Sequence, residues 1–425
     1  MRETLWPVVE EHLDEAEYLV RRWEDGLNSP LLALRRAAHG EERLLSHLDG
    51  LAEACPEALP RLLEPALDGQ DVHRALAAAH AILRTGVPGI ERLVERLLGS
   101  PTAEPCFRAL CLGPREVAPA LGPLLSSSTA LHRAWALGIQ AFRQTPAGGW
   151  LEPFLADETP VVAAAALRVA RFSGSDASKW VQRGLASTDL GLRDAAIEAG
   201  LLGGQRDAWV LAQQAVDRRS LRSDLPFFAI AMSADPKDVE RLAGVLDDEL
   251  ERAAAIYALG FSGLPQAVDL CLPFLRDSAV SRLAGEAIAA VTGLKLEGTF
   301  CQPARDESDG DAPGPDDDPE EMWLVELPVP DPDAVEQWWG ANRARFESGR
   351  RYIGGRPWSP EVLVDALVRG PMRRRHVLAL EASIRTSGRF RLETRGWVRN
   401  QQRALSSAPG SLMSMSPAPF GEWLR

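Results

Sequence analysis

The chain has 425 residues, a length that suggests two or three domains of ordinary size. With 45% hydrophobic and 25% charged residues, its composition is that of a globular protein, which excludes a disordered, collagen-like or coiled-coil chain. No apolar run reaches the ~18 residues of a membrane span. The net charge of −13 disfavours nucleic-acid binding over the whole surface.

The cysteines point to a reducing compartment. They are Cys55, Cys106, Cys111, Cys271 and Cys301, an odd number without a CxxC pair. This is typical of free thiols, so we expect a cytoplasmic protein rather than a disulfide framework. The first residues lack the basic-then-apolar pattern of a secretory leader.

The first predicted element is an amphipathic helix over residues 8–23. Its apolar side carries Val9, Leu13, Ala16, Val20 and Trp23. A turn follows at residues 28–30, and leucines resume the helical spacing after it. Because the other side of the first helix is polar, we interpret residues 1–70 as an N-terminal helical cap.

Residues 71–295 repeat about every thirty residues. Each repeat opens with an Ala-rich stretch, breaks at Gly, Pro or Ser, and continues with a Leu-rich stretch. Apolar residues recur at i, i+3, i+4 and i+7 within each stretch, which predicts two helices per repeat. The repeats begin near Asp71, Thr102, Thr129, Thr159, Asp189, Leu221, Glu249 and Ala279.

A single helical hairpin cannot bury both of its apolar stripes, whereas stacked hairpins can, so the repeats predict a right-handed α-solenoid. Asp or Thr at the head of a repeat is suited to cap the first helix. We expect Gly174, Gly200 and Gly260 to stand at helix ends. Pro226 is expected in a first helical turn.

The repeats over residues 71–292 resemble HEAT repeats, especially the short repeats of phycobilisome lyases. Arg193, Arg252 and Arg282 stand where HEAT units favour a basic residue in the first helix. The resemblance implies a mainly α fold, with a HEAT-like α-solenoid of helical hairpins.

The pattern changes after the repeats. Residues 296–321 are predicted to be an acidic linker, because Asp, Glu, Pro and Gly dominate from residue 303 onwards. Residues 322–405 are predicted to form a small α/β basic unit, with helices over 333–346, 360–369 and 372–384 and strands at 323–327 and 390–394. Residues 406–425 are predicted to be a flexible tail in which Phe420 and Trp423 offer docking side chains.

The C-terminal unit is strongly basic, with fifteen Arg and five acidic residues between positions 343 and 403. Two interpretations remain open: the acidic linker neutralises this charge, or the unit binds an anion or an acidic partner. Gly354 and Gly355 form either a tight turn or an anion-binding loop. The candidate residues for partner or anion binding are Trp338, Trp339, Arg350, Arg351, Arg356, Arg373, Arg374 and Arg375.

The two ends of the chain resemble an uncharacterised proteobacterial family often encoded near type VI secretion spike genes. The resemblance rests on the run from Glu11 to Arg22, His47-Leu-Asp-Gly-Leu, the run Arg351-Tyr-Ile-Gly-Gly-Arg-Pro-Trp-Ser-Pro, and Gln401-Gln. It implies HEAT repeats and a bacterial cytoplasmic setting, and it implies no reaction. This chain departs from the family pattern at Pro371-Met-Arg-Arg-Arg-His.

The sequence predicts no catalytic, cofactor-binding or metal-binding residue and therefore no cofactor. His73 and His80 share a helix face without an acidic partner at i+4, so they do not form a metal site. Cys106 and Cys111 are interpreted as small core residues. The phosphate-binding, hydrolase and metalloprotease motifs are absent from the sequence.

The function predicted from these features is a non-enzymatic protein-binding scaffold or adaptor. The resemblance adds an association with type VI secretion, as a carrier, an adaptor or an immunity factor, with a secretion component or effector as the partner. One alternative is a lyase-like or protein-modifying enzyme with a cleft near Cys106 and Cys111 or near residues 350–360. A third is nucleic-acid binding through Arg373, Arg374 and Arg375.

Overall fold

The computed structural model describes residues 4–100, 103–145, 148–171, 177–218, 223–302, 327–407, 409–413 and 415–424. It is mainly helical, which confirms the predicted class of fold, and the described residues contain one sheet, of two strands. The predicted linker from residue 303, the predicted strand from Trp323, and the residues Thr102, Gly174 and Leu221 lie outside the described residues. None of the described helices has the length and apolar character of a membrane span.

The chain divides into two compact units. Unit 1 comprises residues 1–27, 32–199 and 393–404, and unit 2 comprises residues 28–31, 200–392 and 405–425. Each unit is therefore built from segments that lie far apart in the sequence.

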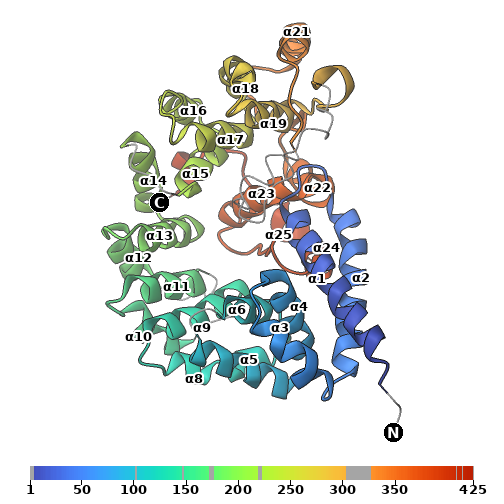
Figure 1. Ribbon diagram of the computed structural model, residues 1–425. Helices are drawn as coiled ribbons and strands as arrows, with labels where there is room; N and C mark the ends of the chain where they lie inside the picture. Colours follow the sequence, from blue (N-terminus) through green and yellow to red (C-terminus); the bar gives the residue numbers. More distant parts are fainter. Residues whose placement is uncertain are drawn as a thin grey trace. The chain divides into compact units, whose positions relative to one another are not determined.

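The helices of unit 1 that lie before residue 200 run from blue to green in Figure 1. They are α1 (Trp6–Asn28), α2 (Leu34–Glu53), α3 (Glu64–Leu67), α4 (Val72–Leu83), α5 (Val87–Gly99), α6 (Glu104–Cys111), α7 (Val117–Ala120), α8 (Gly122–Leu125), α9 (Ala130–Phe142), α10 (Glu152–Leu155), α11 (Pro160–Ala170), α12 (Ser178–Leu185) and most of α13 (Leu190–Leu202). Helix α1 buries Val9, Leu13, Ala16, Val20 and Trp23, as predicted.

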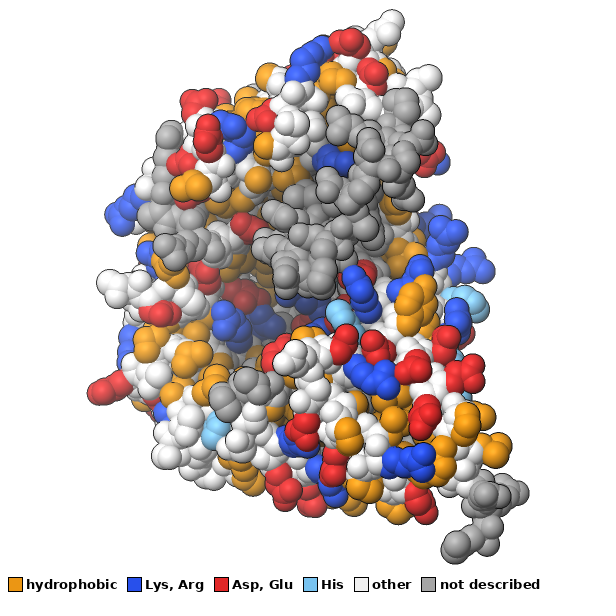
Figure 2. All heavy atoms as spheres, viewed as in Figure 1, with side chains coloured by type: hydrophobic (Ala, Val, Ile, Leu, Met, Phe, Trp, Pro, Cys, Tyr) orange, Lys and Arg blue, Asp and Glu red, His pale blue; other side chains and the backbone are white. Residues whose placement is uncertain are grey.

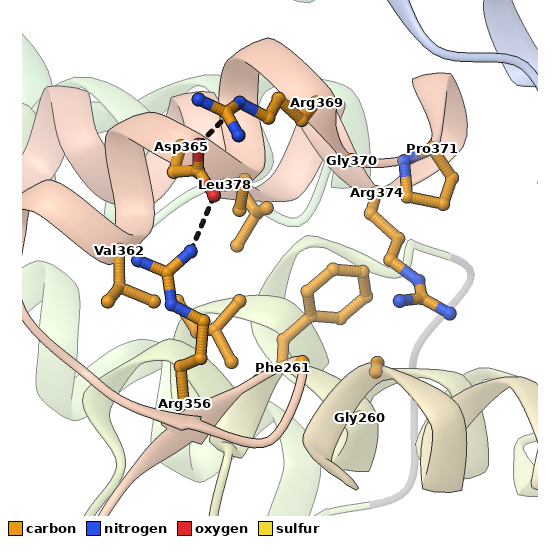
Figure 3. A pocket seen from close by; sticks show the side chains of 14 residues that line it. Gly260, Phe261, Arg356, Val362, Asp365, Arg369, Gly370, Pro371, Arg374 and Leu378 are labelled. Carbon is orange, nitrogen blue, oxygen red and sulfur yellow. Dashed lines mark hydrogen bonds and ion pairs between the residues drawn. The ribbon is translucent and has the colours of Figure 1, made fainter. Parts of the chain in front are cut away.

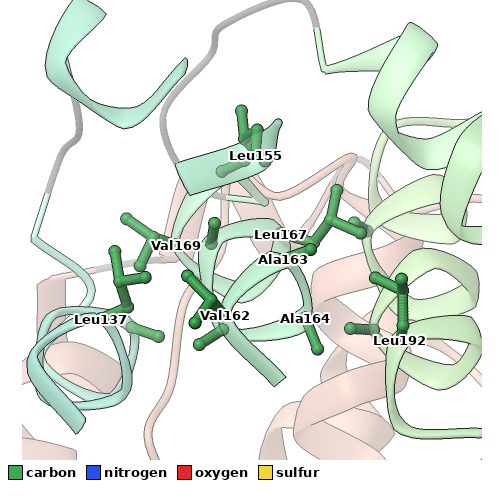
Figure 4. Close-up of a cluster of buried hydrophobic side chains, with 14 of the residues drawn as sticks. Leu137, Leu155, Val162, Ala163, Ala164, Leu167, Val169 and Leu192 are labelled. Atoms are coloured by element: carbon green, nitrogen blue, oxygen red, sulfur yellow. The ribbon is translucent and has the colours of Figure 1, made fainter. Parts of the chain in front are cut away.

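Successive Ala-rich helices of unit 1 pack on one another. Helix α6 contacts both α4 and α9, and α9 contacts α11. In α11 the run from Ala163 to Ala166 is buried, and Leu137 of α9, Leu155 of α10 and Leu192 of α13 belong to the same apolar cluster (Figure 4). The small side chains of α11 let neighbouring helices approach closely, and the leucines fill the remaining space.

An arginine near the start of a first helix forms the same contacts in each unit. In unit 1, Arg133 donates to the carbonyl oxygens of Ser127 and Ser128 and to Asp157, in the turn before α11. In unit 2, Arg252 donates to the carbonyl oxygens of Leu246 and Asp247 and lies 3.5 Å from Asp277, in the turn before α19 (Ser281–Thr292). Each arginine thus connects the turn before its own helix with the turn before the next Ala-rich helix.

Several surface arginines of unit 1 are paired with acids from neighbouring helices. Arg74 of α4 donates to Asp14 and Glu17 of α1 at 2.7 Å, and Arg92 of α5 pairs with Glu64 of α3. In Figure 2 blue and red side chains accordingly alternate over this part of the molecule. Ion pairs as exposed as these each contribute little to the free energy of unfolding. Because each of these arginines has an acidic partner, they do not form a surface of net positive charge.

The C-terminal segment of unit 1, residues 393–404, is held by a buried carboxylate. Glu41 of α2 is 2% exposed and accepts hydrogen bonds from the backbone N–H groups of Val398 and Arg399, at the start of α24 (Val398–Ser407), and from Trp23 Nε1. Trp397 packs against Trp23 and donates to the Leu112 carbonyl oxygen. Burial raises the pKa of Glu41, against the opposing effect of these three donors.

Unit 2 contains the remaining helices and the sheet. They are α14 (Arg206–Asp217), α15 (Leu225–Ser233), α16 (Pro236–Ala243), α17 (Arg252–Ser262), α18 (Pro265–Cys271), α19 (Ser281–Thr292), α21 (Pro332–Asn342), β1 (Tyr352–Ile353), β2 (Arg356–Pro357), α22 (Pro360–Arg369), α23 (Met372–Arg385), α25 (Pro409–Leu412) and α26 (Phe420–Trp423). Pro226 occupies the first turn of α15, as predicted.

The predicted helix ends at Gly200 and Gly260 are wrong. Both residues lie inside helices, and α17 instead ends at Gly263, which has a φ of 68°. At Gly260 a Cβ atom would lie 2.9 Å from the Ala287 Cα of α19. Gly260 is therefore a residue of close helix approach, which local pattern alone does not distinguish from a helix end.

The strand predicted at residues 390–394 is also wrong, because these residues form no strand. The described part of the C-terminal unit contains strands β1 and β2, which form a short antiparallel hairpin. The hairpin extends no sheet because its backbone pairs with helix ends: Tyr352 N–H donates to the Gly263 carbonyl oxygen at 2.8 Å. The helices predicted over 333–346, 360–369 and 372–384 are present, as α21 with the short turn after it, α22 and α23.

The end of the chain packs within unit 2. Phe420 of α26 has no exposed surface, its ring lies 5.7 Å from that of Trp209, and its N–H donates to Ser233 Oγ. Arg385 of α23 donates to the carbonyl oxygens of Ser416 and Ala418. Residues 415–424 thus contribute core contacts to this unit.

Candidate functional site

Three of the six arginines that the sequence singled out, Arg351, Arg373 and Arg375, are buried in unit 2, and a fourth, Arg374, is partly buried. Arg351 and Glu381 form a two-pronged ion pair, and Arg385 Nε donates to the same carboxylate at 2.7 Å. Arg351 also donates to the carbonyl oxygens of Phe261 and Ser262. Burial alone would raise the pKa of Glu381, but the two guanidinium groups outweigh this and hold the pKa below its ordinary value.

Arg373 and Arg374 gather around a second buried carboxylate, Glu286 of α19. Arg374 Nε and Nη2 donate to it at 2.6 and 2.7 Å, and Arg373 Nε lies 3.9 Å from it. Arg373 also lies over the ring of Tyr257. Burial alone would lower the pKa of Arg374, but Glu286 raises it above its ordinary value. The carboxylate thus holds α23 against α19.

Arg375 is fully buried and donates from Nε to the Leu367 carbonyl oxygen at 2.6 Å. Burial lowers the pKa of this guanidinium to about 10. Because Arg373, Arg374 and Arg375 are held by internal partners, their compact basic cluster does not project from the surface. Their placement gives no support to the nucleic-acid alternative.

The two tryptophans of α21 have different surroundings. Trp339 is 4% exposed and donates from Nε1 to Asp269 of α18 at 2.7 Å. Trp338 is half-buried, and its ring stacks on that of Trp339 at 6.4 Å between centroids. Adjacent helical side chains diverge by ~100°, so only one of the two can enter the core. Arg350 is exposed and pairs with Glu347.

Gly354 and Gly355 form a tight turn whose N–H groups are already used. They donate to the carbonyl oxygens of Ala290 and Val291, in the last turn of α19, at 2.8 Å each. This turn therefore supplies hydrogen-bond donors to carbonyl groups at the C-terminal end of α19. Its two N–H groups are not available to bind an anion.

A pocket of about 220 Å³ lies beside this turn. Arg356 of β2 and Arg369 of α22 line it, and both pair with Asp365 of α22, which lies between them (Figure 3). The lining residues are Gly260, Phe261, Ala290, Ile353, Gly354, Arg356, Val362, Asp365, Ala366, Arg369, Gly370, Pro371, Arg374 and Leu378. The pocket therefore joins an apolar floor to a rim of charged groups.

Sequence reasoning found Arg356 and Arg374 of this pocket but missed Asp365 and Arg369. The local signal for the missing pair was present, because an acid and a base four residues apart on one helix face each other. The approach of Arg356 to Asp365 from the hairpin required the tertiary structure.

The pocket lining is mostly apolar, and its charged side chains are Arg356, Arg369, Arg374 and Asp365. The described residues that line it include no Ser, Thr, Cys, His, Lys or Tyr. Its one carboxylate, Asp365, forms ion pairs with the guanidinium groups of Arg356 and Arg369.

The histidines and cysteines do not converge on a second site. Among the described residues, no three His, Cys, Asp or Glu side chains are placed to hold a metal ion. Burial raises the pKa of Cys106 to about 11 and that of Cys111 to about 12, so both stay protonated near neutral pH. Burial lowers the pKa of His80 to about 3, and its ring packs against Trp397.

Comparison with known proteins gives no family for this chain. No protein-family model and no curated protein matches the sequence. A crystal structure of an engineered protein aligns with 98% of this chain and 97% of its own at 15% identity, with a TM-score of 0.26. This TM-score is too low to establish a shared fold.

Proposed function

We propose that this protein is a non-enzymatic protein-binding scaffold or adaptor. The observation that carries the proposal is the pocket of unit 2, where an apolar floor meets the guanidinium groups of Arg356 and Arg369. A concave apolar site with a few convergent polar groups is the usual form of a binding site. Arginine and aromatic side chains, here Phe261, are also among the groups enriched at protein interfaces.

The architecture proposed with this function is a HEAT-like α-solenoid. Two features support it: successive Ala-rich helices pack on one another within each unit, and Arg133 and Arg252 make equivalent contacts to the acid before the next Ala-rich helix. Stacked repeats present extended surfaces to protein partners. From the resemblance of the chain's ends, we further propose a bacterial cytoplasmic setting and a partner among type VI secretion components or effectors.

Affinity purification of the tagged full-length chain from its host cells, followed by mass spectrometry, tests this proposal. The expected result is one protein that is enriched over a tag-only control and forms a stable complex with the purified chain on size-exclusion chromatography. If no protein passes both steps, the adaptor function is wrong. If the captured protein is chemically changed by catalytic amounts of the chain, the enzymatic alternative replaces it.

A further inference from the structure

The pocket of unit 2 combines two chemical environments within the space of one amino-acid residue. Its floor is formed by apolar side chains, among them Phe261, Val362 and Leu378. Arg356 and Arg369 stand at its rim, with side chains that are 54% and 80% exposed (Figure 3). A ligand that fills the pocket therefore meets apolar surface at one end and exposed guanidinium groups at the other.

Asp365 positions these guanidinium groups without using all their donors. Arg356 pairs with it through Nη1, and Arg369 through Nε. A guanidinium group has five N–H donors, so each arginine retains donors for a further acceptor. Asp365 thus restricts the motion of both side chains, so less side-chain conformational entropy is lost when a ligand binds.

The charges at the pocket favour an anion. Arg356, Arg369 and Arg374 contribute three positive charges, against the carboxylates of Asp365 and of Glu286, which pairs with Arg374. One positive charge is left over. The planar guanidinium group matches a carboxylate through two parallel hydrogen bonds, an arrangement that a compact ammonium group does not offer.

The size of the pocket limits the ligand to one residue. Its volume of about 220 Å³ is below the ~300–1,000 Å³ of pockets that enclose a complete drug-sized molecule. Within a polypeptide, only the last residue carries both an apolar side chain and a carboxylate on the same Cα. An internal Asp or Glu would need a neighbouring residue to supply the apolar group.

We propose that this pocket binds the C-terminal residue of a partner protein, with an apolar side chain on the floor and the terminal carboxylate on Arg356 and Arg369. This inference rests on the proposed function, because it names the segment that the adaptor recognises. It adds a chemical rule: the partner ends in a residue such as Leu, Ile, Val, Phe or Met with a free carboxylate.

Fluorescence anisotropy with synthetic peptides tests the inference on the full-length chain. The probe is a fluorescein-labelled Ser-Gly-Ser-Gly-Ser-Gly-Ala-Leu peptide with a free C-terminal carboxylate. Matched probes end in the amide, replace the last Leu with Ser, or carry an internal Glu-Leu pair before an amidated end. We expect the free acid ending in Leu to bind at least tenfold more tightly than each matched probe.

Arg356→Gln with Arg369→Gln is expected to remove this tenfold preference, whereas Arg350→Gln is the matched control and leaves it unchanged. All three side chains are about half exposed or more, so the variants are expected to fold, and thermal unfolding checks this. Equal binding of acid and amide, or of Leu and Ser ends, overturns the inference. So does tighter binding of the internal Glu-Leu probe.

Two further outcomes separate this inference from the proposed function. If the captured partner binds the Arg356→Gln, Arg369→Gln variant as tightly as it binds the unchanged chain, the pocket is not its docking site and the inference is wrong, while the adaptor function stands. If inorganic phosphate displaces the labelled peptide only in proportion to ionic strength, as chloride does, then the site is not a phosphate site and the inference is supported. If phosphate displaces the peptide at an ionic strength well below the one that chloride needs, the inference is wrong.

Discussion

Each of the two units contains a buried carboxylate that contacts the C-terminal part of the chain, but the two carboxylates have different partners. In unit 1, Glu41 accepts two backbone N–H groups and the Trp23 indole N–H. In unit 2, Glu381 forms ion pairs with Arg351 and Arg385. The pKa of Glu41 is raised, chiefly by burial, whereas that of Glu381 is lowered because two guanidinium groups outweigh the effect of burial.

These opposite shifts predict opposite dependence on pH. For Glu381 the folded-state pKa lies below the unfolded one, so its stabilising contribution is present above the unfolded pKa and is lost as the pH falls through the folded pKa. For Glu41 the folded-state pKa is the higher one, so its contribution is present below the unfolded pKa and is lost as the pH rises through the folded pKa.

The largest effect is expected from Glu381→Gln. The substitution leaves two buried guanidinium groups without their counter-charge, which typically costs about 3–5 kcal/mol. Unit-resolved hydrogen exchange measured by mass spectrometry is expected to show this loss in the peptides of unit 2, and the loss is expected to shrink as the pH falls below the ordinary pKa of a Glu carboxyl group. Glu347→Gln, at an exposed acid of the same unit, is the control. A loss of equal size for both variants would contradict the role assigned to the buried ion cluster.

Glu41→Gln is expected to have a smaller effect, about 1–3 kcal/mol in unit 1, because Gln retains one acceptor oxygen for three donors. The pH trend is the reverse of that for Glu381, with a larger loss near pH 4 than near pH 7. Hydrogen exchange of residues 393–404 measures it, and Glu64→Gln, at the surface of unit 1, is the control. A loss that grows with rising pH would show that hydrogen bonding to the ionised form outweighs burial.

The repeated arginine contacts are expected to be equivalent in the two units. Arg133→Gln and Arg252→Gln each remove hydrogen bonds to carbonyl oxygens and an acidic partner, with an expected loss of about 1 kcal/mol for each variant. Urea unfolding, followed by hydrogen exchange in each unit, measures the loss of stability of both variants. If only one of the two substitutions is destabilising, the contacts are not a shared feature of the repeats.

The smallest effects are expected at exposed ion pairs. Lys179→Gln in unit 1 and Arg350→Gln in unit 2 each remove a pair in which both side chains are largely exposed, and each is expected to change stability by less than about 0.5 kcal/mol. Thermal unfolding at low and high salt is the measurement. A loss above 1 kcal/mol at either position would mean that surface charges contribute to the difference between the units.

The local pattern of the sequence predicted where most helices form. The spacing of apolar residues predicted the buried face of α1 and the extents of α22 and α23. It failed at Gly260, since a glycine at a helix end and a glycine at a helix crossing look alike in one sequence. It also predicted strands from short apolar runs, and the described part of those runs, residues 390–394, is irregular backbone instead.

Composition identified the excess of arginine near the C-terminal end of the chain but not its role. Glu286 lies 88 residues before Arg374, so nothing local in the sequence indicates that this carboxylate neutralises the basic cluster. The same holds for the rim of the pocket. The sequence identified Arg356 as a candidate, but it did not indicate that Arg356 pairs with Asp365.

The sequence by itself thus determined the helical periodicity and the mainly α fold, because secondary structure follows from residues within a few positions of one another. The tertiary structure alone decided which charges are buried and paired and which remain at a surface. Ion pairs and pockets join residues that are distant in sequence, and their positions depend on how complete helices pack.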